Sequence, residues 1–250
     1  MPPLFFEVKC PNILVSLNTK TIAMQNSRRK FLQNTSMALM GLSLKPSVLW
    51  SSKDAMAKQK MLIGIQLYSV RADMMKNPLP TLTALAKMGY THVEHANYVN
   101  EKFYGWSAKE FRKVLDGLGL HMPSGHTVMT PKHWDSSKNE FTASWKKTVE
   151  DAATMGQEYV ISPSMDESAR SSYDGLMKQL DQFNKAGDLC KASGMKFGYH
   201  NHNFEFTEKV NGEVIYDLII KHTDPDKVMQ QLDFGNLFGT GARGADWIKK

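Results

Sequence analysis

The fold is decided by the run Glu158-Tyr-Val-Ile-Ser162, the segment YDGLMKQLDQFNKAGDLCKA over 173–192, and the run Met195-Lys-Phe-Gly-Tyr-His-Asn-His202. The two short apolar runs have the length and composition of strands. The amphipathic segment between them predicts a helix that ends at Gly194. A strand, a helix and a second strand in this order are typical of the βαβ unit of a parallel sheet.

The same alternation continues on both sides of this unit, and each predicted strand is followed by a helical segment. The predicted strands cover 62–68, 91–96, 120–126, 158–162, 195–202 and 228–234. Ser107 with Glu110 three residues later is typical of a capping box at the start of one helix. The repeat predicts an α/β fold, either an open doubly wound sheet or a (β/α)8 TIM barrel. No G-x-G-x-x-G follows the first predicted strand, which disfavours a dinucleotide-binding sheet.

Residues 1–57 lack this periodicity. Ser27-Arg28-Arg29-Lys30-Phe31-Leu32 resembles the twin-arginine export signal of bacteria, and a modestly apolar stretch follows over 37–44. Ala55-Met56-Ala57 suits signal peptidase. We expect 1–57 to be an N-terminal extension with a signal peptide, a mature chain from near Lys58, and a periplasmic or secreted protein that meets the export machinery transiently. A basic N-terminal tail is the alternative.

The formal net charge of +6 taken alone favours a nucleic-acid or membrane-surface partner. Residues 1–57 hold seven of the 31 Lys and Arg and two of the 25 Asp and Glu, so 24 basic and 23 acidic residues remain in 58–250. This near-neutral remainder disfavours a nucleic-acid partner. No apolar stretch reaches the roughly 20 residues that span a bilayer, so we expect no stable membrane anchor. Without Cys10, Cys190 has no intrachain partner and is expected to be a buried thiol.

Polar residues gather near the carboxyl ends of the predicted strands. Residues two apart share one face of a strand. Such pairs are Gln66 and Tyr68, His92 and Glu94, Ser124 and His126, His200 and His202, and Gln231 and Asp233. Inward polar groups at the carboxyl ends of parallel strands are where barrel enzymes place their active sites. We therefore expect these side chains to converge on one mouth.

Two of these pairs form a candidate metal site. His200 and His202 point the same way, and Asp233 on the next strand supplies a carboxylate. A His and Asp set suits Mn²⁺, Fe²⁺, Co²⁺ or Zn²⁺ better than Ca²⁺. The alternative is a polar cleft in which the two histidines only form hydrogen bonds.

Three motifs resemble the sugar phosphate isomerase/epimerase family of xylose-isomerase-like TIM barrels. They are Gly198-Tyr-His-Asn-His-Asn-Phe-Glu-Phe206, Gln231-Leu-Asp-Phe-Gly-Asn236 and Gly89-Tyr-Thr-His-Val-Glu94, and the resemblance covers about 62–250. It implies one divalent metal (Mn, Co, Mg, Fe or Zn) bound by Glu, Asp, His and Glu on the fifth to eighth strands. The first two of these positions fall on His200 and Asp233. Glu94 matches the second-strand carboxylate that lines the substrate pocket.

This chain departs from the family pattern in two ways. His200 replaces a carboxylate that also acts as an acid/base in the epimerases, so the proton shuttle between two carboxylates is not expected to persist unchanged. Only six βα units fit into 58–250. We therefore expect a C-terminally truncated barrel without the strands that carry the remaining His and Glu ligands.

The resemblance implies an isomerase or epimerase, or a related lyase, that acts on a sugar or keto-sugar through an enediolate. A general base removes the proton next to the carbonyl. The candidate bases are Glu94, His126 and Glu205, of which Glu205 also suits orienting a histidine. The side chains expected to bind the carbohydrate are Gln66, His202 and Asn236. A homo-oligomer is compatible with the sequence.

Two other functions stay open. A nuclease that resembles endonuclease four would use a three-metal cluster and a basic DNA-binding face, which the near-neutral charge and the export signal disfavour. A non-catalytic sugar-binding barrel would stack aromatic rings on sugars. The aromatic residues available are Tyr98, Phe103, Tyr104, Trp106 and Trp134, which equally suit core or loop packing.

Overall fold

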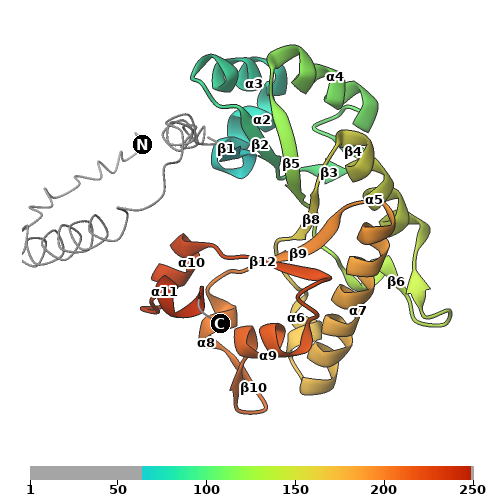
Figure 1. Ribbon diagram of the computed structural model, residues 1–250, viewed down its shortest axis with the longest axis vertical. Coiled ribbons are helices and arrows are strands. Elements are labelled where there is room, and N and C mark those ends of the chain that lie inside the picture. The colour runs from blue at the N-terminus through green and yellow to red at the C-terminus, as the bar shows by residue number, and fades with distance from the viewer. Residues whose placement is uncertain (1–63, 249–250) are drawn as a thin grey trace, which may run out of the picture. The chain divides into compact units, whose positions relative to one another are not determined.

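The computed structural model describes residues 64–248, and the predicted signal and cleavage motifs lie outside them. Within this range six parallel strands form one sheet in the order β1-β2-β5-β8-β9-β12 (Figure 1). They are β1 (Gly64–Gln66), β2 (His92–His95), β5 (His121–His126), β8 (Tyr159–Ser162), β9 (Lys196–His200) and β12 (Val228–Gln231). Each strand pairs with the next strand of the repeat, whereas a doubly wound sheet reverses its order. Of the two predicted architectures, the TIM-barrel type is confirmed, with six of its strand units in the described residues.

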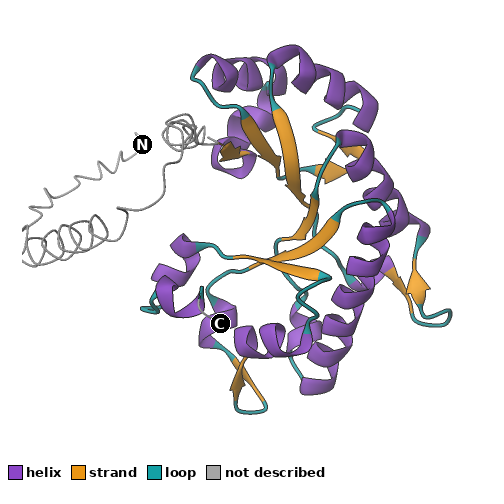
Figure 2. Ribbon diagram, viewed as in Figure 1, coloured by secondary structure: helices purple, strands orange, loops and turns teal. Residues whose placement is uncertain are grey.

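Helices cover the outer side of the curved sheet (Figure 2). The longer ones are α3 (Pro78–Lys87), α4 (Ala108–Leu118), α5 (Ala143–Met155), α7 (Tyr173–Ala192) and α9 (Ile215–His222). Shorter ones are α2 (Arg71–Lys76), α6 (Glu167–Arg170), α8 (Phe204–Thr207), α10 (Phe234–Phe238) and α11 (Gly244–Trp247). Two 3₁₀ turns lie at Leu67–Val70 and Pro131–His133.

The helix ends follow the local sequence signals. Ser107 and Glu110 form the predicted capping box of α4, in which each side chain satisfies a backbone N–H of the other. Ser172 starts α7 because its hydroxyl accepts a hydrogen bond from the Gly175 amide. Gly156 ends α5 with a φ of 76°, a left-handed conformation that glycine adopts without steric cost.

The core lies between the sheet and the helices in two clusters of buried side chains. One cluster contains Phe111 and Leu115 of α4 with Leu67 and Val93. The other joins α5, α7 and α9 to β8, β9 and β12. Its Cys190 is a free, buried thiol, as expected, and burial raises its pKa to about 12. None of the helices between residues 64 and 248 is long and apolar enough to cross a membrane.

The register of the sheet brings polar residues of neighbouring strands to one level. Gln66 pairs with Glu94, and Glu94 pairs with Ser124 on the other side. At the far end of the sheet Gln231 pairs with His200. Polar side chains that are far apart in sequence therefore stand beside each other at the carboxyl ends of the strands.

Several predicted strands are shorter in the structure. β9 ends at His200 and β12 ends at Gln231, so His202 and Asp233 lie in the loops that follow. Tyr68 lies in the 3₁₀ turn after β1, and its backbone N–H donates to Gln66 Oε1 at 2.8 Å. The predicted strands are therefore too long at these three ends. A turn, and not the strand pleat, orients the second residue of each pair.

Three two-stranded hairpins decorate the loops and were not predicted. They are β3 (Tyr98–Val99) with β4 (Lys102–Phe103), β6 (Trp134–Asp135) with β7 (Glu140–Phe141), and β10 (Lys209–Val210) with β11 (Glu213–Val214). The first of these hairpins follows β2 directly. It therefore contributes to the wall around the carboxyl ends of the strands.

Candidate functional site

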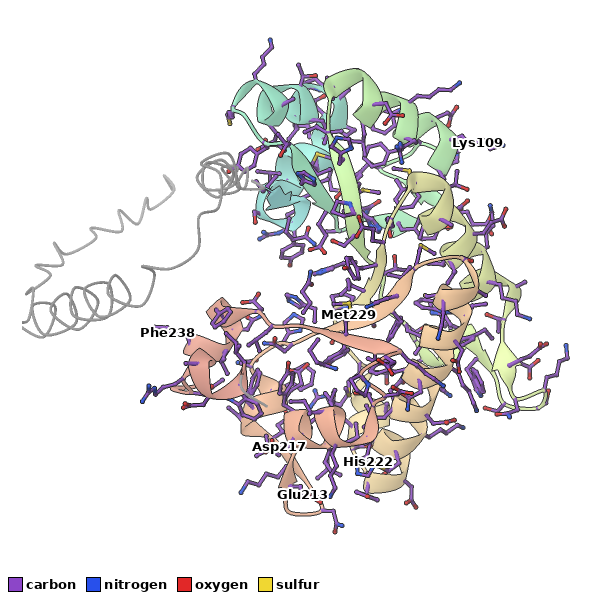
Figure 3. The ribbon with its side chains drawn as sticks, in the orientation of Figure 1. Lys109, Glu213, Asp217, His222, Met229 and Phe238 are labelled. Atoms are coloured by element: carbon purple, nitrogen blue, oxygen red, sulfur yellow. The ribbon has the colours of Figure 1, made fainter. Side chains whose placement is uncertain are left out.

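A cavity of about 920 Å³ lies at the carboxyl ends of the strands. Seven of the eight predicted site residues line it: Gln66, Glu94, His126, His200, His202, Asp233 and Asn236. Side chains from the strands and their loops crowd into the space inside the arc of the sheet (Figure 3). The eighth predicted residue, Glu205, is not part of the lining. The expected convergence on one mouth is therefore observed for these seven residues.

The carboxylate of Glu94 is the best-bonded group in this cavity. Its Oε1 accepts hydrogen bonds from Ser124 Oγ at 2.6 Å and from Gln231 Nε2 at 2.8 Å. Its Oε2 accepts from Gln66 Nε2 at 2.9 Å and lies 3.2 Å from His126 Nε2. Three hydrogen-bond donors and the neighbouring His126 ring hold this carboxylate in place. Glu94 therefore orients its neighbours better than it accepts a proton from a substrate.

Gln231 transmits this orientation to two histidines. A carboxylate only accepts, so Glu94 requires the amide nitrogen of Gln231 and turns the amide oxygen the other way. That oxygen lies 2.7 Å from His126 Nε2 and 3.0 Å from His200 Nδ1. His126 Nε2 and His200 Nδ1 must therefore each carry a hydrogen. One carboxylate, through one amide, sets the tautomers of both histidines.

The opposite nitrogen of His200 faces a carboxylate. Burial lowers the pKa of His200 and favours its neutral form. With Nδ1 protonated, the lone pair of Nε2 points at Asp233 Oδ2, 3.6 Å away. Two lone pairs that face each other repel unless a cation lies between them. Metal bonds of about 2.1 Å at angles of about 90–120° place donor atoms about 3.0–3.6 Å apart, which matches this pair.

Asp233 is held by its place at the start of α10. Its Oδ1 accepts a hydrogen bond from the Asn236 amide at 2.9 Å, which leaves Oδ2 toward His200. Its own amide donates to Asn201 Oδ1 at 2.7 Å, and Asn201 Nδ2 donates back to the Asp233 carbonyl at 3.2 Å. Asn201 is fully buried. These two hydrogen bonds hold the loops after β9 and β12 together.

His202 supplies a second unused lone pair. Its Nδ1 is buried and has no hydrogen-bond partner. Burial also lowers the pKa of this histidine, and its ring stacks on Phe204 with centroids 6.1 Å apart. Its ring centroid is 5.5 Å from that of His200. A neutral His202 therefore offers an acceptor or ligand atom beside the candidate metal pair.

Glu205 acts beneath the cavity and not in it. Its carboxylate is fully buried and accepts from the His202 amide at 2.8 Å and from Tyr199 Oη at 2.5 Å. Burial raises its pKa. This geometry fits the orienting role expected for Glu205 and offers no path for it to reach a substrate in the cavity.

The arrangement of donor atoms was compared with what a divalent metal ion requires. No group of three or more His, Cys, Asp or Glu between residues 64 and 248 is placed to hold a metal ion. His200 Nε2 and Asp233 Oδ2 fit a divalent ion in distance and in charge, and the orphaned Nδ1 of His202 lies nearby. The donor set therefore fits a metal through two ligands.

The roles of Gln231 and Asn201 were missed. Gln231 was expected to face the mouth but was given no role, and Asn201 was not a predicted site residue; their position in the family-like motifs was the available signal. His92, expected to converge on the mouth with Glu94, instead lies at the amino ends of the strands, in a separate cavity with His121. Of the aromatic residues, Phe103 is buried and Trp106 stacks on Phe111, so both belong to the core.

Comparison with known proteins identifies the family of the chain. The family model described as xylose isomerase-like TIM barrel matches residues 82–250. The chain belongs to the xylose isomerase-like TIM barrel family. No curated protein matches it.

Similar solved structures extend the family assignment. Two structures of a sugar phosphate isomerase/epimerase from Parabacteroides distasonis ATCC 8503 match at 30% and 29% identity, each with a TM-score of 0.66 and over 75% of this chain. The matches cover 74% and 70% of those chains. A D-psicose 3-epimerase is similar at 17% identity and a TM-score of 0.56, over 76% of this chain and 69% of its own, and shows the shared fold alone. Proteins named as isomerases or epimerases are thus among its structural neighbours.

Proposed function

We propose that this xylose isomerase-like barrel is a metal-dependent isomerase or epimerase, or a related lyase, that acts on a free sugar or keto-sugar. The observation that carries the proposal is the 3.6 Å distance between His200 Nε2 and Asp233 Oδ2 in a cavity of about 920 Å³. His200 and Asp233 would hold the divalent ion, which polarises a carbonyl oxygen when bound. The candidate ions are Mn, Co, Mg, Fe and Zn.

His126 is the proposed general base. Its Nε2 donates to Gln231 Oε1 and lies 3.2 Å from Glu94 Oε2, so Nδ1 is left as the acceptor. Glu94 stabilises the imidazolium that forms when Nδ1 takes the proton next to the carbonyl, as a buried carboxylate does in a catalytic triad. The same nitrogen returns the proton to the former carbonyl carbon, and the hydroxyl proton of the first carbon passes to the former carbonyl oxygen. One base that serves two adjacent carbons suits an isomerisation best, and no oxidant or other reactant is consumed.

The substrate is proposed to be uncharged. The described cavity lining contains the carboxylates of Glu94 and Asp233 and neither lysine nor arginine. Two carboxylates repel an anionic phosphate group and accept hydrogen bonds from sugar hydroxyls. Gln66, His202 and Asn236 line the same space and are proposed to bind the hydroxyls. Export by the twin-arginine signal would place the enzyme where free sugars are the common form.

Hydrogen exchange tests this function directly. The full chain is incubated with Mn²⁺ in D₂O with a panel of free aldohexoses and ketohexoses, and the products are analysed by NMR. We expect deuterium at the carbon next to the carbonyl for at least one sugar, together with its isomer, epimer or elimination product. An absence of exchange and product for every sugar, with Mn²⁺ bound, would contradict the proposal.

A further inference from the structure

A second cavity adjoins the first and has no role in the reaction described above. This side pocket, of about 530 Å³, lies between the hairpin after β2, the loop after β5 and the start of α5. Ala96, His126 and Val128 line both cavities. A ligand whose reacting atoms lie at His126 therefore has two directions in which to extend.

The side pocket presents fixed, neutral hydrogen-bonding groups. His133 Nδ1 lies 3.1 Å from the Thr130 amide, which always donates, so Nδ1 is the acceptor and Nε2 carries the hydrogen. Burial lowers the pKa of His133 and keeps it neutral. Thr148 donates its hydroxyl to the Ser144 carbonyl at 3.1 Å, so its oxygen lone pairs are acceptors. The pocket thus offers both donors and acceptors without a cation.

One wall of the side pocket is a rigid aromatic ring. Tyr98 Oη donates to Asp151 Oδ2 at 2.7 Å, and Lys147 Nζ binds the other oxygen of that carboxylate at 2.7 Å. Asp151 is buried, so this network fixes the Tyr98 ring. A fixed ring with polar groups around it matches a sugar ring, which has apolar C–H faces and hydroxyls at its rim.

The hairpin turn beside this wall is strained. Asn100 and Glu101 have φ values of 52° and 59°, as in a type I′ turn, which favours glycine at the second position. Glu101 lines the side pocket and adopts the left-handed conformation in spite of its Cβ. Such strain persists where the side chain has a use. The Glu101 carboxylate accepts hydrogen bonds from hydroxyls and repels anions.

We propose that the side pocket binds the second ring of a neutral reducing disaccharide or keto-glycoside whose carbonyl-bearing sugar occupies the main cavity. This inference rests on the proposed function and narrows its substrate class to two-ring carbohydrates. The second ring packs on Tyr98, accepts from His133 Nε2, and donates to Thr148 and Glu101. The extra contacts strengthen binding of the two-ring ligand over that of a single sugar.

Titration calorimetry on the full chain tests the subsite. The probes are glucose and three reducing disaccharides: maltose, cellobiose and lactose. We expect at least one disaccharide to bind at least tenfold tighter than glucose. Ser144→Trp fills the pocket from an exposed position and is expected to reduce that advantage to within twofold, with glucose affinity unchanged. Ala143→Trp, on the same exposed helix turn but outside both linings, is the matched control and should change neither affinity.

A second variant guards against misfolding. Glu101→Gly relieves the turn and should keep or raise the Tm, while the disaccharide advantage falls at least fivefold. The subsite is overturned if glucose binds as well as every disaccharide, if Ser144→Trp weakens both ligands equally, or if Glu101→Gly leaves the advantage intact. If neither glucose nor any disaccharide binds, the proposed function fails and the subsite with it.

Discussion

Each end of the sheet carries a pair of facing histidines, and the two pairs differ in what surrounds them. His92 and His121, at the amino ends of the strands, have ring centroids 5.5 Å apart, and His126 and His200, at the carboxyl ends, have centroids 4.8 Å apart. His121 is exposed, and the nearest bonded group of His92 is the hydroxyl of Thr91 at 2.8 Å. Proximity of two rings is therefore common to both ends.

Only the carboxyl-end pair shares an acceptor that a carboxylate orients. Gln231 Oε1 binds both His126 and His200. The same amide donates its Nε2 hydrogen to Glu94 Oε1, which fixes its orientation. At the amino end the charged neighbour Arg112 is committed to the Met155 carbonyl at 2.7 Å and to Asp116 at 2.9 Å. The candidate site therefore differs from a mere cluster of histidines because hydrogen bonds fix the tautomers of its two histidines.

The largest expected effect comes from one histidine of each pair. His126→Asn removes the proposed base, and we expect hydrogen exchange of the best sugar substrate to fall by about 10²–10⁴-fold. His121→Asn is the matched variant at the amino end, and its rate of hydrogen exchange should stay within about twofold of the wild-type rate. Deuterium incorporation followed by NMR measures both. Equal losses in the two variants would remove the distinction between the two ends.

Loss of the relay, the hydrogen bonds that run from Glu94 through the Gln231 amide to His200, is expected to have the next largest effect, on metal affinity. Gln231→Leu removes the amide that orients His200, and loss of such an outer contact typically weakens metal binding by about 10–100-fold. Gln230→Leu is the control on the same strand, since Gln230 Oε1 is buried without a partner and contributes nothing to the relay. Mn²⁺ affinity, measured by electron paramagnetic resonance, separates them. Unchanged affinity in Gln231→Leu would mean that His200 needs no orientation.

The space around Gly125, in the sheet beneath His126, is more tightly packed than the space around Gly117 on the surface of α4. A Cβ at Gly125 of β5 would lie 1.8 Å from the His95 ring, so Gly125→Ala is expected to cost about 1–3 kcal/mol of unfolding free energy. Gly117 lies inside α4 with nothing within 4 Å of its Cβ position. Gly117→Ala should instead stabilise by about 0.5–1 kcal/mol. Urea denaturation gives both values, and a stable Gly125→Ala protein would show that the His95 ring is free to move.

The buried His95 predicts how stability depends on pH. Burial, with a smaller contribution from the charge of His126, lowers its pKa from 6.5 to about 3. The unfolded chain therefore binds a proton between pH 6.5 and 3 that the folded chain does not. The stability that His95 contributes is complete above pH 6.5 and is lost as the pH falls toward 3, by at most about 1.4 kcal/mol per pH unit.

Urea denaturation between pH 7 and pH 4 checks this slope. His95→Gln is less stable at neutral pH but should show a flatter dependence on pH, because the titrating group is gone. His121→Gln, at the exposed amino end, should keep the wild-type slope. If the slope survives in His95→Gln, another group controls the acid sensitivity.

The repeat and most of the site were predictable because each strand carries its polar residues at one end. Strand length was less predictable. The turns after His200 and Gln231 depend on two hydrogen bonds between the Asn201 side chain and the Asp233 backbone, which join two loops. The relay of Gln231 to Glu94 joins residues 137 positions apart, and only the register of the sheet brings them together.

The small hairpins show two different reasons for a missed element. Asn211-Gly212, between β10 and β11, is a common type I′ turn signal that the sequence carried openly, and both residues have positive φ. Asn100-Glu101 lacks the glycine, so its turn carried no such signal. The side pocket that it borders was therefore invisible at the level of residue patterns.

The most direct test of the proposed metal pair is Mn²⁺ binding to the full chain and to two variants, measured by electron paramagnetic resonance. Asp233→Asn keeps the hydrogen bond to the Asn236 amide and removes only the charge that faces His200. His92→Ala alters the amino-end pair. We expect one Mn²⁺ site that Asp233→Asn abolishes and His92→Ala leaves intact. Mn²⁺ binding that survives in Asp233→Asn, or that disappears in His92→Ala, would contradict a metal held by His200 and Asp233.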